Sequence, residues 1–233
     1  MLFSKFKHKH MKSFLLASVL LLWAERGAAQ KTEATQTEKV KTTFYLGFGM
    51  QAASDYNINS KLKSAALPQI KRNIPEFTAG LNMLGSKYSG DLEASTAYST
   101  DELNNTTNEY LNSSVRLRLQ RILVKKNKVL FSAGGNIGFT SNSLNVFSNN
   151  NLVDINNLAN TINVTHLGLR NNMLYLGPTL SLTAFRKARF PIRLHVGYEF
   201  ALTKGRWQSD FTTINNTVGE WGKNRLFVSL NVM

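Results

Sequence analysis

The sequence contains no cysteine among its 233 residues. Without cysteine the chain has no disulfide framework, no thiolate metal site and no lipid-modified cysteine as an anchor. It also lacks any run of about 20 apolar residues, the length that a helix needs to cross a bilayer. A closed β-barrel satisfies every backbone polar group within itself, so it is the one membrane-spanning structure left open to this chain.

Acidic residues are scarce as well. There are 14 Asp and Glu against 28 Lys and Arg, which gives a net charge of +14. A basic excess can indicate nucleic-acid binding. The N-terminal segment argues against that, because it has the features of an export signal. For an exported basic protein we expect anionic lipid head groups or a phosphorylated surface glycolipid as partners, and no nucleic acid.

Residues 1–29 have the order of a secretory signal peptide. Lysines precede an apolar run from Phe14 to Trp23, and the small residues Gly27, Ala28 and Ala29 follow it. We expect cleavage after Ala29, with Met11 as an alternative start. Residues 30–42 are polar and predict a flexible periplasmic lead. Residues 43–233 are predicted to form the barrel.

Eight segments alternate apolar with small or polar residues, the period of a strand that faces two different surroundings. The predicted strands are 43–53, 76–84, 91–99, 114–124, 129–140, 173–185, 192–203 and 224–232. Eight strands joined in sequence predict an all-β fold, an eight-stranded antiparallel up-and-down transmembrane β-barrel.

The links between these strands alternate in length. We expect long links at 54–75, 100–113, 141–172 and 204–223, and tight ones at 85–90, 125–128 and 186–191. Long loops at one rim and short turns at the other are typical of bacterial outer-membrane barrels. Aromatic residues near both rims predict interfacial girdles. The localisation expected is therefore the outer membrane, with both termini on the periplasmic side.

The polar face of the strands is the one that we expect inside. It is rich in glycine, which suits the crowded interior of an eight-stranded barrel. It also carries charges of both signs, which predict a salt-bridged plug in the lumen. The expected lumen charge network is Glu93, Arg116, Arg118, Arg193, His195, Glu199 and Arg225.

These features resemble the small outer-membrane β-barrel proteins of the OmpA and OmpX type. The Asn-rich loops, the Ala28-Ala29-Gln30 leader end and the segment Val196-Gly197-Tyr198-Glu199-Phe200 look like the outer-membrane β-barrel domain proteins common in Bacteroidetes. The resemblance covers about residues 43–233 and implies a barrel with no catalytic motif. One departure is the last residue, Met233, where such barrels usually end in an aromatic residue.

The chain offers little for catalysis. After removal of the signal peptide the remaining histidines are His166 and His195. We interpret His195 as a hydrogen-bonded lumen filler and His166 as a loop residue, although an acyl-hydrolysing serine site would need one of them. The spacing of acidic residues predicts no metal site, and no cofactor-binding motif is present.

Basic residues gather in two of the predicted long loops. The candidate glycolipid contacts are Lys61, Lys63, Lys71, Arg72, Lys204 and Arg206. Cations at these positions suit the phosphates of a surface glycolipid, and a solvated basic rim is the alternative. The Asn-rich segment 141–172 either extends its strands above the membrane or folds as a cap.

Three functions stay open at this point. The first is a monomeric, non-enzymatic outer-membrane barrel whose loops either interact with the cell's surroundings or stabilise the membrane. The sequence does not identify the extracellular partner of such an interaction. The second is a narrow channel for small solutes, and the third is an outer-membrane lipid-modifying enzyme.

Overall fold

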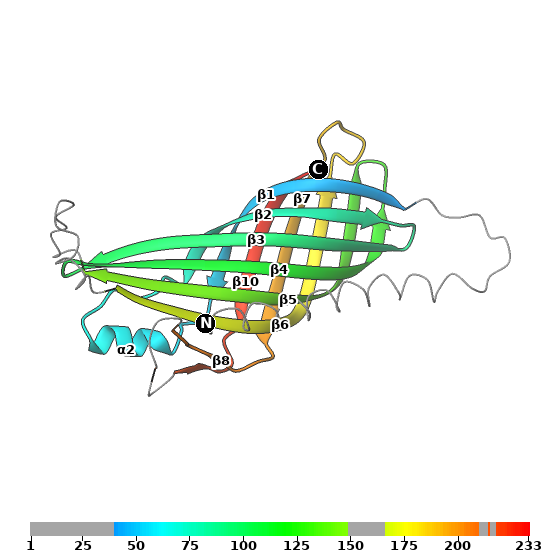
Figure 1. Ribbon diagram of the computed structural model, residues 1–233. Helices are drawn as coiled ribbons and strands as arrows, with labels where there is room; N and C mark the ends of the chain where they lie inside the picture. The colour runs from blue at the N-terminus through cyan, green and yellow to red at the C-terminus, as the bar shows by residue number, and fades with distance from the viewer. Residues whose placement is uncertain (1–39, 149–165, 210–213, 215–217) are drawn as a thin grey trace, which may run out of the picture. The chain divides into compact units, whose positions relative to one another are not determined.

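The computed structural model describes residues 40–148, 166–209, 214 and 218–233. In this part of the chain eight strands close into a barrel in the order β1-β10-β7-β6-β5-β4-β3-β2, and all neighbours pair antiparallel (Figure 1). The barrel strands are β1 (Lys41–Ala53), β2 (Asn73–Leu84), β3 (Tyr88–Leu103), β4 (Thr106–Lys125), β5 (Val129–Ser148), β6 (His166–Ala184), β7 (Ile192–Ala201) and β10 (Arg225–Val232). The eight-stranded antiparallel barrel predicted from the alternation is confirmed. β1 begins two residues before the predicted barrel boundary at residue 43. The predicted signal peptide, residues 1–29, lies outside the described residues.

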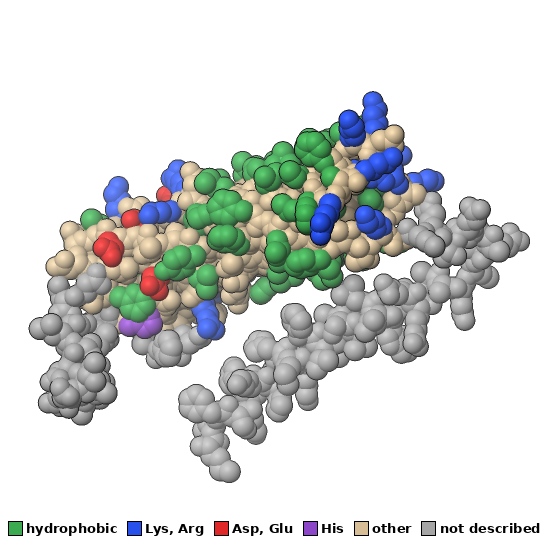
Figure 2. Space-filling model, turned by 90° about the horizontal axis from the view of Figure 1, so that it is seen from above, with side chains coloured by type: hydrophobic (Ala, Val, Ile, Leu, Met, Phe, Trp, Pro, Cys, Tyr) green, Lys and Arg blue, Asp and Glu red, His purple; other side chains and the backbone are tan. Residues whose placement is uncertain are grey.

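Each barrel strand has a buried polar face and an exposed apolar face. In β4, for example, Arg116 and Arg118 are buried, whereas Leu117 and Leu119 are 46% and 66% exposed. Apolar side chains cover much of the visible barrel wall in Figure 2. The exposed apolar residues of the wall, which we call the apolar belt, include Phe44, Leu46, Phe48, Phe77, Leu81, Leu92, Val115, Leu117, Leu119, Ile137, Phe139, Leu176, Leu180, Leu182, Leu194, Phe200, Leu226, Val228 and Leu230.

Two inward glycines show how tightly the interior is filled. A Cβ on Gly177 would collide with the backbone carbonyl of Tyr198 on the neighbouring strand. A Cβ on Gly197 would enter the ring of Phe227, which is fully buried. The predicted role of inward glycines in a crowded lumen is therefore seen at these two positions, where any side chain would displace a neighbour.

The strands β3, β4, β5 and β6 are longer than predicted. They have 16, 20, 20 and 19 residues, against 10 in β7 and 8 in β10. The long link predicted at 100–113 is wrong, because β3 and β4 stay paired up to a two-residue turn at Asn104 and Asn105. Both turn residues have positive φ, 51° and 57°, which asparagine tolerates and which suits a tight hairpin.

The segment 141–172 follows the first of its two predicted alternatives over its described part. β5 continues to Ser148 and β6 starts at His166, and the two pair as far as Phe147 and His166. The central residues 149–165 lie outside the described residues. Beyond the apolar belt the outward side chains of β5, such as Ser141, Ser143 and Asn145, are polar, and apolar side chains such as Leu144 and Val146 lie on the inward face instead. The apolar-outward alternation of the belt is therefore lost although the strands go on.

The links after β1 and β7 are long, as predicted, but they contain short elements. Helix α2 (Ile58–Ser64) lies in the first, and β8 (Gly205–Arg206) pairs with β9 (Gly219–Glu220) in the last. Within the described ranges no helix is long and apolar enough to cross a membrane. The three short turns, at 85–87, 126–128 and 185–191, are all at the opposite rim.

Candidate functional site

The interior of the barrel holds a cluster of buried ion pairs centred on Arg116. Its guanidinium lies 2.6 Å from Glu76, 3.0 Å from Glu93 and 3.3 Å from Glu199. Arg118 pairs with the two carboxylate oxygens of Glu93, and Arg225 pairs with Glu199. All these side chains are at most 1% exposed. Burying charges costs several kcal/mol each unless they are paired and hydrogen bonded. Here Glu93 and Glu199 each pair with two arginines, and Glu76 pairs with Arg116.

The sequence-predicted lumen residues come together with two exceptions. Arg193 pairs with Asp91 at 2.8 Å, and not with Glu93 or Glu199. His195 is fully buried, but neither of its ring nitrogens has a hydrogen-bond partner among the described residues. The interpretation of His195 as a hydrogen-bonded filler is therefore wrong. It packs edge-on against Tyr45, with 6.0 Å between ring centroids.

Two carboxylates of the cluster were missed at the sequence level, Glu76 and Asp91. Glu76 is two residues before Thr78, and Asp91 is two residues before Glu93. Because side chains two apart on a strand point to the same face, and Thr78 and Glu93 point inward, both carboxylates are expected inside. With them, the buried ion pairs inside the described barrel join four arginines to four carboxylates, and the cluster is neutral overall.

Aromatic rings separate and support these arginines. The guanidinium carbons of Arg116 and Arg118 lie 4.5 Å and 5.1 Å from the centroid of the Phe227 ring. Arg225 lies 4.1 Å from the ring of Tyr175 in the same way. Cation–π contacts of this kind gain strength away from water. The packed rings and ion pairs fill the cross-section of the barrel.

The long-loop rim has an ordered cap of its own. The indole of the buried Trp207 donates to Glu220 at 2.7 Å. The carboxylate of Glu220 also accepts from the backbone N–H groups of Asn57, at 2.6 Å, and Ile58, at 3.1 Å. One buried acid thus joins the last long loop to the start of α2. Apolar residues of α2 and the extended strands pack around it, among them Ile58, Leu62, Leu144 and Leu169.

The candidate glycolipid contacts divide into two groups. Lys61 and Lys63 lie on the exposed side of α2, while Lys71 and Arg72 pair with Asp101 at 3.5 Å and Asp55 at 3.3 Å. The hydrogen bond from Asn59, with the nearby Arg72, holds the pKa of Asp55 below the ordinary value of an aspartate. These four cations are spread along the first loop and form no common site.

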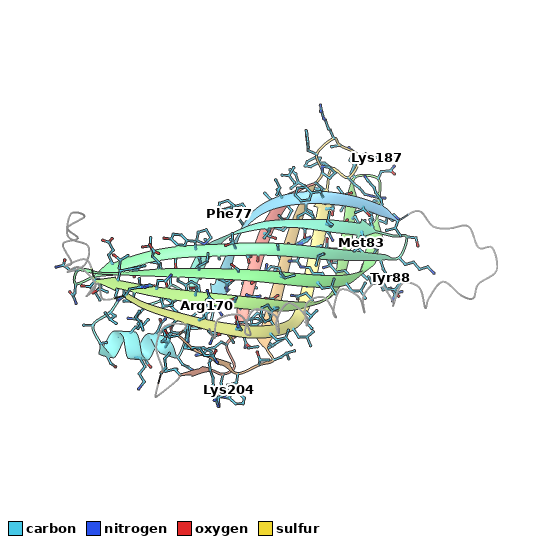
Figure 3. The ribbon with its side chains drawn as sticks, viewed as in Figure 1. Phe77, Met83, Tyr88, Arg170, Lys187 and Lys204 are labelled. Carbon is cyan, nitrogen blue, oxygen red and sulfur yellow. The ribbon has the colours of Figure 1, made fainter. Side chains whose placement is uncertain are left out.

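Lys204 and Arg206 belong instead to a compact site with Arg170. The backbones of Arg170 and Gln208 exchange two hydrogen bonds, of 2.7 and 2.8 Å, which fix the last loop against β6. A hollow of about 360 Å³ results, lined by Arg170, Asn172, Lys204, Arg206 and Gln208. We call this the basic hollow. Figure 3 labels two of its lining residues, Arg170 and Lys204.

The basic hollow faces outward from the barrel. Arg170 and Asn172 are exposed and share their strand face with Leu176, Leu180 and Leu182 of the apolar belt. Lys204 lies 4.5 Å from the ring of Trp221, which is 64% exposed. Three cations and an aromatic ring therefore lie just beyond the edge of the belt. Arg170 was missed from the sequence because its backbone partner, Gln208, lies in another loop.

Among the described residues no group of three or more His, Cys, Asp or Glu side chains could hold a metal ion. His166 is exposed, stacks on Phe147 with ring centroids 4.6 Å apart, and lies 3.3 Å from Asn145. That places it at the far end of the β5–β6 pair.

The fold and the interior define the class of protein: a closed eight-stranded barrel with an apolar outside and a charged, filled inside. Solved structures similar to this chain are outer-membrane barrels. Ail, the attachment invasion locus protein of Yersinia pestis, has 9% identity and a TM-score of 0.47, over 82% of this chain and 95% of that one. Neisserial surface protein A has 8% identity and a TM-score of 0.42, over 82% and 97%. OprG from Pseudomonas aeruginosa has 12% identity and a TM-score of 0.39, over 84% and 96%.

No protein-family model and no curated protein sequence matches the chain. The resemblance to the Bacteroidetes barrel-domain proteins therefore stays a prediction.

Proposed function

We propose that this protein is an integral outer-membrane barrel, monomeric and non-enzymatic, whose lumen is filled and whose long-loop rim contacts surface glycolipid. The observation that carries the proposal is that the barrel has an apolar belt on its outside and a neutral cluster of ion pairs on its inside. Monomeric soluble proteins rarely expose a contiguous apolar patch above a few hundred Å². A bilayer accepts such a wall, provided that the sheet is closed.

The filled lumen distinguishes this proposal from a narrow channel. Arg116 reaches carboxylates on β2, β3 and β7, so its ion pairs cross the interior from one wall to the other. Phe227 packs beneath it. An ion moving through the barrel would have to break these pairs, and each broken pair leaves a buried charge without a partner.

The basic hollow supports the glycolipid part of the proposal. With the long-loop rim outside the cell, Arg170, Lys204 and Arg206 lie at the level where phosphates of the outer leaflet meet the apolar belt. Arginine binds phosphate through paired N–H groups and lysine through its point charge. The neighbouring Trp221 suits the interface between chains and head groups.

Two measurements on the reconstituted full-length protein test the barrel. We expect a mobility shift between heated and unheated samples on gels, and no stable single-channel steps in a planar bilayer. Stable steps would contradict the filled lumen. Removal of acyl chains or other groups from lipid A in the presence of the protein, seen by mass spectrometry, would support a lipid-modifying enzyme instead.

The glycolipid contact needs a matched comparison. We expect the double variant Lys204→Gln, Arg206→Gln to retain less lipid A on purification than the wild-type protein. The control is Lys61→Gln, Lys63→Gln, which removes the same charge from α2. Equal loss of lipid A from both variants would favour the solvated basic rim over a defined site.

A further inference from the structure

The short-turn end of the barrel contains a hollow that the proposed function does not use. It has a volume of about 440 Å³ and opens at the rim where β1 begins and β10 ends. We call it the mouth pocket. Five cationic side chains line it: Lys41, Arg186, Lys187, Arg189 and Arg193. Neutral side chains that can hydrogen bond, such as Asn82 and Ser89, line its inner wall.

Positive charge at this end has few counter-charges. The lining of the mouth pocket contains no Asp or Glu. The three short turns, 85–87, 126–128 and 185–191, contain six Lys and Arg and no acidic residue. Lys and Arg side chains gather at one end of the molecule in Figure 2, the end of these turns. Like charges gathered at one end repel one another, so an anion bound among them would lower the free energy of the folded rim.

One lining cation is already balanced and forms the floor of the pocket. Arg193 is 1% exposed and donates to Asp91 at 2.8 and 3.3 Å and to Gln120 at 3.2 Å. Its Nε has no hydrogen-bond partner among the described residues. The other four cations have no carboxylate partner among the ion pairs of the described chain.

The outer wall of the pocket is held in place before any ligand arrives. The N–H of Ala188 donates to Phe185 at 2.7 Å, and that of Arg186 donates to Lys128 at 3.3 Å. The Arg186 guanidinium reaches the carbonyl of Lys126 at 3.5 Å. The turn 185–191 therefore presents Lys187 and Arg189 on a fixed backbone, and Figure 3 labels Lys187 at its tip.

We propose that the mouth pocket binds a phosphate-bearing anion on the periplasmic side. Four unbalanced cations suit a group with two or more negative charges, and the lining hydroxyl groups and the Asn127 amide can donate to its remaining oxygens. The ion-pair cluster above Arg193 closes the inner end, so the anion is held there and not transported.

Two sources could supply this phosphate. A soluble phosphate ester could enter from the periplasm. A phospholipid of the inner leaflet could instead present its head group, since Phe185 and Phe190 on the same turn are 60% and 61% exposed at the edge of the apolar belt. The chemistry at the pocket is the same in both cases.

Binding is measured with the purified full-length protein and two probes. Inorganic pyrophosphate is titrated into protein in neutral detergent by calorimetry, and retention of phosphatidylglycerol against phosphatidylcholine is measured by native mass spectrometry. The variant Lys187→Gln, Arg189→Gln removes two exposed cations of the pocket and leaves the Arg193–Asp91 pair in place. The control Lys61→Gln, Lys63→Gln removes the same charge from the other rim.

We expect the pocket variant to weaken binding of at least one probe by about tenfold or more, and the control to leave it nearly unchanged. Pyrophosphate binding supports a soluble ligand, and retention of phosphatidylglycerol alone supports a lipid head group. Binding of neither probe, or equal weakening by the control, would overturn the proposal. Gel mobility and conductance of the same samples report separately on the barrel and its filled lumen.

Discussion

Arg116 and Glu76 meet inside the barrel at 2.6 Å although their strands, β4 and β2, are not neighbours. β3 lies between them and contributes Glu93 to the same guanidinium. The arginine side chain therefore connects three consecutive strands inside the barrel, in addition to the backbone hydrogen bonds that pair them. Its third partner, Glu199 on β7, extends the connection to the opposite wall.

This arrangement makes Glu93 a sensitive position. Replacing Glu93 with Leu leaves Arg118 without its carboxylate and Arg116 with one fewer, and loss of one partner of a buried pair typically costs about 3–5 kcal/mol. We expect a lower midpoint in the heat-modifiability assay on gels. Glu102→Gln, an exposed acid on β3, is the control. A shift no larger than that of the control would show that the cluster contributes little to stability.

The contact between Gly197 and Phe227 predicts a second stability effect. Gly197→Ala inserts a methyl group into the Phe227 ring, which also supports Arg116 and Arg118. Overpacking of this kind costs about 1–3 kcal/mol. Gly90→Ala is the matched control, because its new methyl group would meet its nearest neighbour at 3.8 Å. Adding Phe227→Leu to Gly197→Ala should recover part of the loss; no recovery would place the strain elsewhere.

The hairpin at Asn104 and Asn105 gives a prediction about local order. We expect slow amide exchange over the paired parts of 100–113, since these residues continue the β3–β4 ladder. Asn104→Val, a β-branched residue at a φ of 51°, should cost about 1–2 kcal/mol locally and speed exchange near the turn. Thr106→Val, in the adjacent strand position, should have little effect. Fast exchange throughout 100–113 in the wild-type protein would contradict the extended hairpin.

The first long loop should loosen in acid. Because the pKa of Asp55 is lowered in the folded protein by Asn59 and Arg72, its contribution to stability is present above the unfolded pKa. It is lost as the pH falls through the folded value. We expect protease cleavage within residues 54–72 to increase below about pH 4. Asp55→Asn should be cleaved similarly at all these pH values. A wild-type loop that stays resistant through this range would rule out the contribution of Asp55.

The sequence predicts the strands well where they cross the apolar belt. There one face is apolar and the other is polar, so the alternation is visible, as in Leu117 and Leu119 opposite Arg116 and Arg118. Beyond the belt the apolar-outward alternation is lost: most residues of 100–113 are polar, and the buried Tyr110 lies on the inward face. The residues of this segment therefore resemble those of a polar loop. A long link was predicted there for that physical reason.

Pairing between strands is harder to predict than the face of each strand. Parity places Asp91, Glu93 and Arg193 inside, but the choice of Asp91 for Arg193 depends on their height in the barrel and hence on strand register. Likewise, Arg170 joins Lys204 and Arg206 through a backbone pairing between β6 and the last loop. Such contacts depend on tertiary structure, which the alternation of residues along each strand does not encode.

The two-residue turn at the end of the β3–β4 hairpin is also a practical insertion site. A peptide inserted between Asn104 and Asn105 would be carried on a paired two-stranded support, away from the basic hollow. Because the inward packing of the barrel lies elsewhere, an epitope tag at this site would report surface display and orientation in intact cells without altering the parts that hold the barrel together.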